Sequence, residues 1–545
     1  MALLARIFSL RTQAPLTAVV SLLAGKYLPR HLGSGSSWRY STYVWLVSSL
    51  VYIIFWCQVY PRYVSPLRHV PGPKSIISLG YRGMLKREKP MGDLYLELVK
   101  KYPGEDLLSM AAFDERLLVT NPQLLADLFV HRSYDYVKPP NVSNFLRLVL
   151  GNGLILSEGD QHKFQRKNIA PAFNFRHIKN LYPMMWTKAV EMTNLLRSQI
   201  TQREAKDSNV VELRSWGSKI AMDIIGVAGL GREFNMLNNA DDPLLQVYHE
   251  LLEPSQQNVA YAMACFMFGL GFVRLLPWRM NQIFNGLTNS LGEHCRAMVR
   301  EKREAIEKRS DEHFDILSLL IKSDNFSDDD LKDQLLTFLA AGHETTAGSI
   351  TWICYLLSKH QDAQQKLRTE LQKNLSPGIL QGDTTDIATI LEQLPYLNGV
   401  MNESLRLYPT IPLTSRSAIR DTQLGPQFIA KGTRVLVMPW LLNRSPSVWG
   451  ADAVEFRPER WISENGKPNQ TGGASSNYDM VTFMHGARSC IGQGFAKAEL
   501  RCILAALAGS FSWELAMDDA LVVPKGVITI KPANGLYLRL TPLEA

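Results

Sequence analysis

Residues Ser41 to Tyr60 form a run of 20 amino acids without a charged side chain. A backbone that crosses a lipid bilayer must satisfy its amides and carbonyls internally, and about 20 apolar residues suffice to cross as a helix. Aromatic side chains, which favour the membrane–water interface, lie toward both ends of the run, at Tyr43, Trp45, Trp56 and Tyr60. We therefore predict a transmembrane anchor over 41–60 rather than a buried core helix.

Two short segments, residues 1–40 and 61–75, flank this run. Residues 1–40 hold a shorter apolar stretch, Ala14 to Gly25, which is either a second membrane element or an interfacial one. Basic residues flank the long run on both sides, so charge does not orient it. Residues 61–75 contain Pro71-Gly72-Pro73, which predicts a stiff hinge before the body at 76–545. We expect a membrane protein that crosses once or twice.

The composition of the body restricts its class. Apolar residues make up 46% and charged residues 20% of the chain, so a large core can be buried. The six cysteines show no regular spacing and no C-x-x-C pair, which argues against a disulfide framework and structural zinc. The net charge of +8 is moderate, and no zinc-finger or RNA-binding motif occurs, so no nucleic-acid partner is expected.

Periodicity indicates an α-rich α+β fold with small sheets. Ser327 followed by Asp330 predicts a capping box that opens a long helix to about Lys359. Further helices are expected over 362–374, 397–408 and 494–507, and strands over 117–120, 434–438 and 536–540.

The segment from Phe483 to Gly492 reads FMHGARSCIG and has the features that a thiolate ligand of iron requires. Glycines let backbone amides approach the sulfur, and a following helix directs its amino end toward the anion. Phe483 can shield the sulfur of Cys490 from water, and Arg488 can pair with a carboxylate. A lone cysteine is usually an inert buried thiol, but here four further positions match at fixed spacing.

This segment resembles the cysteine loop of the cytochrome P450 family, F-x-x-G-x-R-x-C-x-G, and the resemblance extends from about Pro71 to the carboxyl end. It implies a P450-like haem-thiolate fold, heme b as the cofactor and Cys490 as the axial metal ligand. The implied activity is that of a monooxygenase, an oxidoreductase that inserts one atom of O₂ into a lipophilic substrate. The overall motif style looks like that of fungal biosynthetic members, which favours secondary-metabolite substrates.

A second motif lies inside the long predicted helix, at Ala341-Gly342-His343-Glu344-Thr345-Thr346. A threonine hydroxyl can bond to a carbonyl one turn earlier, and glycine weakens the helix, so the two can open a notch. Alone, the motif is weak, but it is similar to the oxygen-activation motif of the family. The resemblance implies that Glu344 and Thr345 manage protons, whereas His343 is read as a satisfied helix residue.

The resemblance also implies roles for other residues. Glu403, Arg406 and Arg460 would form a buried structural lock, and His162, Arg166 and Arg416 would lie near haem propionates. His162 and Asn443 depart from the family pattern, which usually has tryptophan at the first position and often histidine at the second. The residues expected to line the substrate pocket, any of which can instead be core, are Phe145, Phe338, Ala341, Ile411, Leu413 and Val527.

Electrons are expected from a partner, because no dinucleotide motif or flavin domain is found in the chain. An NADPH-dependent flavoprotein reductase in the same membrane would supply them, with Lys163, Lys167 and Lys497 as docking candidates or as ordinary solvated lysines. The expected location is the endoplasmic reticulum, with the catalytic domain facing the cytosol. Two alternatives stay open: a haem-thiolate isomerase or dehydratase, and a non-catalytic haem-binding membrane protein.

Overall fold

The computed structural model describes residues 19, 21, 23, 37–74, 91–111, 115–202, 209–239, 242–252, 255–308, 315–526 and 528–543. These residues divide into two compact units, which are described separately. The first unit comprises residues up to Val137 and Ser415–Met438, and the second comprises Lys138–Thr414 and Pro439–Ala545. The predicted second membrane element at 14–25 lies almost entirely outside the described residues.

The apolar run near the amino terminus is helical, as predicted. Helix α4 (Ser37–Ile54) continues as the π-helical η1 (Phe55–Val64). In the described part of the chain, Ser41–Val64 is the one helix that is long and apolar enough to cross a membrane, with a mean hydropathy of 1.6. Pro61 lies inside η1, so the helix continues past the predicted end at Tyr60.

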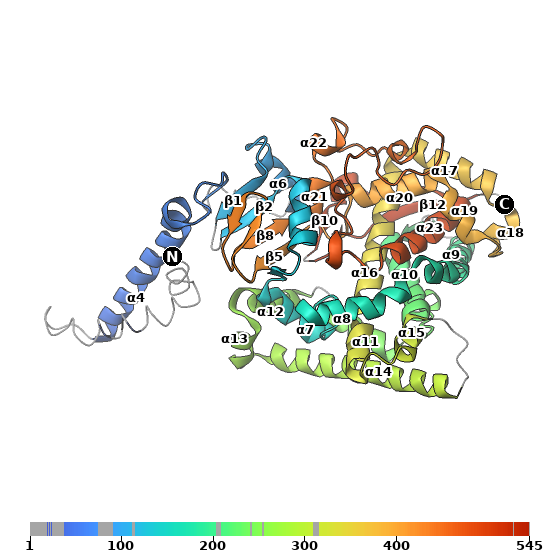
Figure 1. Ribbon diagram of the computed structural model, residues 1–545. Helices are drawn as coiled ribbons and strands as arrows, with labels where there is room; N and C mark the ends of the chain where they lie inside the picture. Colours follow the sequence, from blue (N-terminus) through green and yellow to red (C-terminus); the bar gives the residue numbers. More distant parts are fainter. Residues whose placement is uncertain are drawn as a thin grey trace. The chain divides into compact units, whose positions relative to one another are not determined.

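A five-stranded sheet forms the centre of the first unit, with strand order β1-β2-β8-β5-β3 (Figure 1). Leu117 and Leu118 are fully buried, so β2 has both faces covered. Strand β2 pairs antiparallel with β1 and parallel with β8. The remaining elements are helices α6 (Met91–Val99), η2 (Pro122–Leu124) and η3 (Asp127–His131), and the hairpin β6 (Thr422–Leu424) and β7 (Gln427–Ile429). The sheet strands are β1 (Leu107–Ala111), β2 (Glu115–Val119), β3 (Tyr136–Val137), β5 (Thr414–Ala418) and β8 (Arg434–Val437).

The predicted hinge follows an edge of this sheet. The amide of Ser109 donates to the Pro71 carbonyl at 2.8 Å, and the amide of Ala111 donates to the Pro73 carbonyl at 3.1 Å. Gly72 has φ 138°, and a Cβ there would lie 2.3 Å from the Ser109 carbonyl oxygen. Only glycine fits this close approach, so the Pro-Gly-Pro segment is held against β1 by backbone hydrogen bonds.

The second unit is mainly helical (Figure 1). Its helices of six or more residues are α7 (Pro140–Leu150), α8 (Gly159–Ile169), α9 (Phe175–Gln202), α10 (Leu213–Ile225), α11 (Pro243–Leu252), α12 (Gln256–Phe268), α13 (Leu270–Leu275), α14 (Arg279–Glu307), α15 (Ile316–Lys322), α16 (Asp328–Lys359), α17 (Gln361–Asn374), α19 (Ile387–Gln393), α20 (Pro395–Leu407) and α23 (Gln493–Ser510). Shorter ones include α18 (Pro377–Leu380), α21 (Pro439–Leu442), α22 (Pro446–Trp449), η4 (Ala170–Phe173), η5 (Gly226–Leu230), η6 (Met236–Asn238), η7 (Pro458–Trp461), η8 (Asn477–Asp479), η9 (Gly486–Arg488) and η10 (Asp519–Leu521).

Helix α16, yellow in Figure 1, is the central helix of this unit and packs against α10, α20 and α23. Its start confirms the predicted capping box: the amide of Asp330 donates to Ser327 Oγ, and the amide of Ser327 donates to Asp330 Oδ2. Side chains on nearly all faces of its second half are buried, because neighbouring helices surround it. The helix therefore gives the middle of its sequence, where the second motif lies, a rigid position.

Two small sheets complete the second unit. Strands β4 (Val210–Glu212), β12 (Tyr537–Pro542) and β9 (Phe511–Leu515) form one, and β10 (Pro524–Lys525) and β11 (Lys531–Pro532) form the other. The predicted strands at 117–120, 434–438 and 536–540 correspond to β2, β8 and β12, and the predicted helices at 362–374, 397–408 and 494–507 correspond to α17, α20 and α23. The expected α-rich fold with small sheets is confirmed.

Candidate active site

The Cys490 loop is held in a tight backbone conformation before α23 begins. The amide of Cys490 donates to the Phe483 carbonyl at 2.8 Å, which closes the loop. Met484 (φ 56°) and Gly486 (φ 69°) adopt left-handed conformations, which let the chain reverse direction within a few residues. Helix α23 starts three residues after Cys490, with Gly492 as its N-cap residue. The sulfur therefore lies near a helix amino terminus, as the sequence predicted.

Cys490 differs from the other cysteines of the chain. The other five are buried, whereas Cys490 keeps accessible surface although protein atoms surround it closely. Burial raises the pKa of the Cys490 thiol, and the amide of Gly492 and the nearby Arg166 charge act in the opposite direction. A backbone donor and a cation thus favour the anion, which is the form that binds a metal. Cys490 is the cysteine of this chain that a metal can reach.

Cations outnumber carboxylates beside the loop. The Arg488 guanidinium, whose side chain is 4% exposed, forms an ion pair with Glu158, and Glu158 also accepts from the Lys138 amide at 2.9 Å. His162 is buried, and burial, followed by the Arg488 and Lys138 charges, lowers its pKa to about 4. His162 is therefore neutral near pH 7 and retains one N–H to donate.

Arg166 and Arg416 occupy different units. Arg166 Nη1 donates to the Ser489 carbonyl at 2.6 Å, and Nη2 donates to Ser489 Oγ at 3.2 Å, so Arg166 holds the residue next to Cys490. Arg416 lies on β5 in the first unit, with its guanidinium 5.7 Å from the Phe129 ring centroid. The structure thus brings Arg166 to the cysteine loop, and the propionate contact of Arg416 stays a prediction.

The residues of the second unit fit a haem. Cys490 offers an accessible sulfur with a backbone donor, and Phe483 lies half-buried at the start of the loop. Arg488, Lys138 and Arg166 supply three positive charges near His162, whereas Glu158 supplies one negative charge. An excess of cations beside a metal-ligating thiol suits a ligand that carries carboxylates, such as the two propionates of haem.

The Glu344–Thr345 motif lies in the middle of α16. Thr345 Oγ1 donates to the Ala341 carbonyl at 2.6 Å, which confirms the predicted bond to the preceding turn. The Glu344 carboxylate lies 3.3 Å from Lys531 Nζ of β11. His343 is buried and its Nε2 contacts Ser218 Oγ at 2.6 Å, so the ring has a hydrogen-bond partner within the protein. In the described residues, no cluster of histidine, cysteine or acidic side chains could hold a further metal ion.

Gly342 allows two helices to pack closely. Helix α16 is α-helical from Asp328 to Lys359, and the predicted notch at Gly342 and Thr345 stays a prediction. A Cβ at Gly342 would lie 2.8 Å from Ile225 Cδ1 on α10. The missing side chain therefore allows α10 to pack closely against α16 beside the motif.

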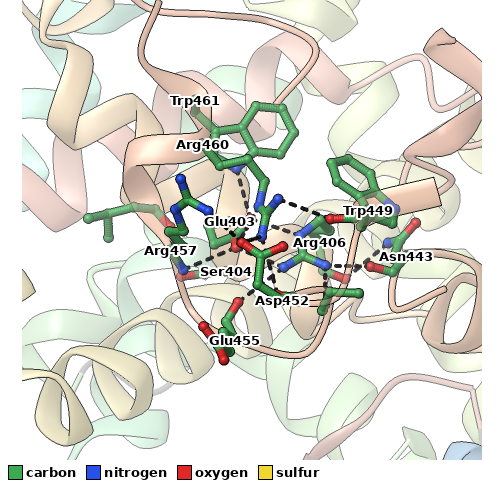
Figure 2. A network of polar contacts seen from close by, with 12 residues as sticks. Glu403, Ser404, Arg406, Asn443, Trp449, Asp452, Glu455, Arg457, Arg460 and Trp461 are labelled. Carbon is green, nitrogen blue, oxygen red and sulfur yellow. Dashed lines mark hydrogen bonds and ion pairs between the residues drawn. The ribbon is translucent and has the colours of Figure 1, made fainter. Parts of the chain in front are cut away.

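The predicted lock is formed (Figure 2), with Glu403 and Arg406 fully buried and the Arg460 side chain 9% exposed. Glu403 accepts from Arg406 Nη2 at 2.7 Å, from Arg406 Nε at 2.8 Å and from Arg460 Nε at 3.3 Å. Trp461 Nε1 and the amide of Arg457 also donate to this carboxylate, at 2.9 and 3.1 Å. The remaining donors of Arg406 reach the carbonyls of Asn443, Ala453 and Glu455. Every charge in this network has several polar partners, which burial requires.

Asn443 connects the lock to the cysteine loop, a role that was not predicted from the sequence. Its Nδ2 donates to the Arg406 carbonyl at 3.1 Å and to Thr482 Oγ1 at 2.8 Å. Its Oδ1 accepts from the amide of Val481 at 2.9 Å. Asn443 is fully buried, so these contacts fix the chain just before Phe483. The feature of the sequence that could have indicated this role is a polar residue, Asn443, inside an apolar segment.

The predicted pocket residues divide by exposure. Phe145 is buried in an aromatic cluster with Phe266, at a ring-centroid distance of 5.2 Å, and Phe338 packs against Phe173 at 5.8 Å. Both therefore have a role in core packing. Ala341 is exposed and Ile411 and Leu413 are partly exposed, so these three keep surface that a substrate can contact. Val527 lies outside the described residues.

The predicted docking lysines are also unlike one another. Lys163 is exposed and paired with Asp160 at 2.8 Å, and Lys167 is exposed. Lys497 is half-buried with Nζ 5.9 Å from the Phe483 ring centroid, and burial lowers its pKa to about 8. Lys497 therefore packs against the cysteine loop, and Lys163 and Lys167 are the more accessible charges.

The sequence reasoning missed partners that lie far away along the chain. Glu158 was not singled out as the partner of Arg488, nor Ser489 as that of Arg166 or Lys531 as that of Glu344. A fourth is Glu499, fully buried on α23, which accepts a hydrogen bond from Thr346 of α16 at 3.1 Å. The signal that could have indicated Glu499 was the single acidic residue of a largely apolar helix.

Comparison with known proteins identifies the family of this chain. The family model described as Cytochrome P450 matches residues 70–538. Cytochrome P450 monooxygenase sphH of Aspergillus fumigatus is 41% identical over 507 residues, covering 91% of this chain and 92% of that protein. Cytochrome P450 monooxygenase ptmK of Penicillium ochrochloron is 34% identical, covering 92% and 99% of the two chains. Cytochrome P450 monooxygenase FUM15 of Gibberella moniliformis is 33% identical, covering 95% and 96%. The chain therefore belongs to the cytochrome P450 family and is a haem-thiolate monooxygenase with haem b as its cofactor.

Proposed function

We propose that this monooxygenase oxidises a lipophilic secondary metabolite of a fungus while anchored in the endoplasmic reticulum membrane by the helix over Ser41–Val64. The accessible sulfur of Cys490, beside the Gly492 amide and the Arg166 charge, is the observation that carries the chemistry. Three relatives from fungi support the source and the kind of pathway. The apolar helix supports the anchor.

The overall reaction balances as substrate–H + O₂ + NADPH + H⁺ → substrate–OH + H₂O + NADP⁺. When bound, the haem iron with its thiolate ligand supplies the cleavage of the O–O bond and the transfer of one oxygen atom. Cys490 ligates the iron, Phe483 restricts the access of water to the sulfur, and Gly492 donates to it. Arg488, Arg166 and His162 would hold the propionates.

Two residues of α16 manage the protons. Glu344 takes a proton from solvent, and Thr345 holds a hydroxyl whose own hydrogen is already donated to the Ala341 carbonyl. The oxygen lone pairs of that hydroxyl are thereby left to accept. Ala341, Ile411 and Leu413, together with Phe145, Phe338 and Val527, present small or apolar side chains, which suits a lipophilic substrate.

Electrons come from an NADPH-dependent flavoprotein reductase in the same membrane. Reductases of this kind are acidic on the docking side, and Lys163 and Lys167 are exposed cations on α8, the helix that also carries His162 and Arg166. Lys497 is half-buried against Phe483 and is the less accessible candidate.

The visible spectrum of the dithionite-reduced full-length protein under carbon monoxide tests this function. We expect a strongly red-shifted Soret band in the wild type and its complete loss in Cys490→Ala. The matched control is Cys502→Ala, which removes a fully buried thiol of the neighbouring helix α23 and should leave the band in place. An imidazole-type band in the wild type, or retention of the red-shifted band in Cys490→Ala, would contradict the assignment.

A further inference from the structure

An ion pair joins the catalytic motif to a separate small sheet. Lys531 of β11 places its Nζ 3.3 Å from Glu344 Oε1 of α16, and the two side chains are 20% and 40% exposed. The residues are 187 positions apart in the sequence. The pair is therefore half-buried and formed by tertiary packing, unlike the pairs that form along one exposed helix face.

The backbone beside Lys531 is fixed against α16. The amide of Ile530 donates to the Thr410 carbonyl at 2.8 Å, and Trp352 Nε1 of α16 donates to the Ile530 carbonyl at 3.2 Å. Ile530 is buried, and β11 pairs with β10 in the register Lys525↔Lys531. The position of Lys531 Cα is thus determined by contacts that do not involve its charge.

The surroundings of Glu344 contain little that could replace Lys531. Among the described residues, Lys531 is the cation that forms an ion pair with Glu344. The other neighbour is Tyr248 of α11, which is buried and whose pKa is raised by burial and by the Glu344 charge. A neutral phenol does not balance a carboxylate, so Lys531 provides the compensating charge.

We propose that Lys531 is a positioning residue that holds the Glu344 carboxylate in one orientation and thereby sets how efficiently protons reach the reacting oxygen. This inference rests on the proposed role of Glu344. An ordinary half-exposed ion pair contributes little to stability, so a structural explanation predicts small effects on unfolding and none on catalysis. If Lys531 positions Glu344, its loss should also change the proportion of reduced oxygen that is released as hydrogen peroxide.

The two ways in which reduced oxygen can leave without product differ in their need for protons. Hydrogen peroxide forms as NADPH + O₂ + H⁺ → NADP⁺ + H₂O₂, without cleavage of the O–O bond. Water forms as 2 NADPH + O₂ + 2 H⁺ → 2 NADP⁺ + 2 H₂O, with cleavage. A carboxylate that no longer delivers protons in the required position shifts the balance toward peroxide.

The experiment uses the haem-loaded full-length protein with NADPH and a flavoprotein reductase, and it needs no identified substrate. The ratio of hydrogen peroxide formed to NADPH consumed is measured for the wild type, Lys531→Met and Lys531→Arg. We expect Lys531→Met to raise the ratio about two- to fivefold, as loss of one ion pair would. Lys531→Arg keeps the charge and should restore most of the wild-type value.

A matched control separates this effect from loss of any ion pair. Lys188 pairs with Glu191 on α9 at the same distance, 3.3 Å, with side chains 10% and 32% exposed, and also with Glu233 at 3.5 Å, so its substitution removes at least as much ion pairing. Lys188→Met should leave the peroxide ratio unchanged. The midpoints of thermal unfolding should shift by similarly small amounts in Lys188→Met and Lys531→Met.

A double-mutant cycle with Glu344→Gln decides the assignment. If Lys531 acts through Glu344, Lys531→Met has no further effect on the peroxide ratio once Glu344 is glutamine. An equal rise in both backgrounds, or a failure of Lys531→Arg to restore the ratio, would overturn the proposal. The reduced carbon monoxide spectrum of the wild type tests the proposed function separately from the role of Lys531. If the red-shifted Soret band is present but the effects of the two substitutions are additive, only the role of Lys531 is rejected.

Discussion

Two buried glutamates show how differently this molecule treats charge in neighbouring helices. Glu403 of α20 receives donors from two arginines, a tryptophan and a backbone amide (Figure 2). Glu499 of α23 is just as fully buried, yet its recorded hydrogen bond comes from Thr346, and burial raises its pKa well above the usual range. The first region stabilises an ion pair, and the second favours the protonated form of its acid.

This difference reflects what each region must do. The lock is complete within the protein, since each of its charges is matched by another protein group. Among the described residues, Glu499 on the helix that follows Cys490 forms no ion pair, and the Cys490 thiol itself has its pKa raised by burial. Charge on the sulfur therefore becomes favourable when a metal cation binds, so the loop is adapted to its cofactor and the lock to the fold.

The largest expected effect comes from breaking the lock. Glu403→Gln keeps the shape of the side chain but leaves the buried Arg406 charge unbalanced, which should cost about 3–5 kcal/mol of stability and reduce haem incorporation. Thermal unfolding and the haem-to-protein ratio measure this. Glu459→Gln, which breaks the exposed Glu459–Lys366 pair, is the control and should cost at most about 1 kcal/mol. Equal stability of the two variants would contradict the comparison.

A smaller effect is expected where the two regions meet. Asn443→Ala leaves the Val481 amide and the Arg406 carbonyl without the Asn443 side chain, at a cost of about 1–3 kcal/mol. Because this contact fixes the start of the cysteine loop, the red-shifted carbon monoxide band should also be lost faster on warming. Asn398→Ala removes an equally buried amide of α20 that contacts Arg501, and it should lower stability without this spectral change. The same band lifetime in both variants would limit Asn443 to a structural role.

The smallest effect, near pH 5, concerns Glu499. An acid whose pKa is raised on folding keeps its proton in the native state, so its contribution to stability is present below the unfolded pKa of about 4.3 and is lost as pH rises. Glutamine is neutral at every pH, so Glu499→Gln should remove this pH-dependent loss of stability. The stability difference between Glu499→Gln and the wild type should be below about 1 kcal/mol near pH 5. As the pH rises above 5, the stability difference should grow in favour of the variant, by at most about 1.4 kcal/mol per pH unit.

Denaturant unfolding of the full-length protein at several pH values measures that slope. A difference that stays constant with pH would mean that Glu499 titrates alike in the folded and unfolded chains, and it would remove the contrast with Glu403.

The sequence predicted local structure more reliably than tertiary contacts. The capping box at Ser327, the bond from Thr345 to Ala341 and the lock of Glu403 with Arg406 are confirmed, because their members lie within one helix turn. The pairs Lys531–Glu344 and Arg488–Glu158 were not predicted. They join residues that only the packing of separate elements brings together, and a single sequence holds no periodic signal for such contacts.

Departures from expectation have similar causes. The anchor helix extends to Val64 because the π-helical turns continue past Pro61. Phe145 and Phe338 were expected to line the substrate pocket or to belong to the core; both are buried against other aromatic rings, and their pocket role stays a prediction. Apolar side chains suit a core and a pocket equally well, so composition alone does not separate the two.

The close approach of α10 to α16 at Gly342 constrains how this enzyme can diverge. Any side chain at position 342 would collide with Ile225, whose Cδ1 lies 2.8 Å from the site of a Cβ. A lineage that acquires alanine at 342 would need the Ile225 side chain to shift or to become smaller, and a lineage that shortens Ile225 would gain freedom at 342. Substitutions at the two positions, one on α10 and one beside the proton-handling motif, should therefore be coupled among descendants.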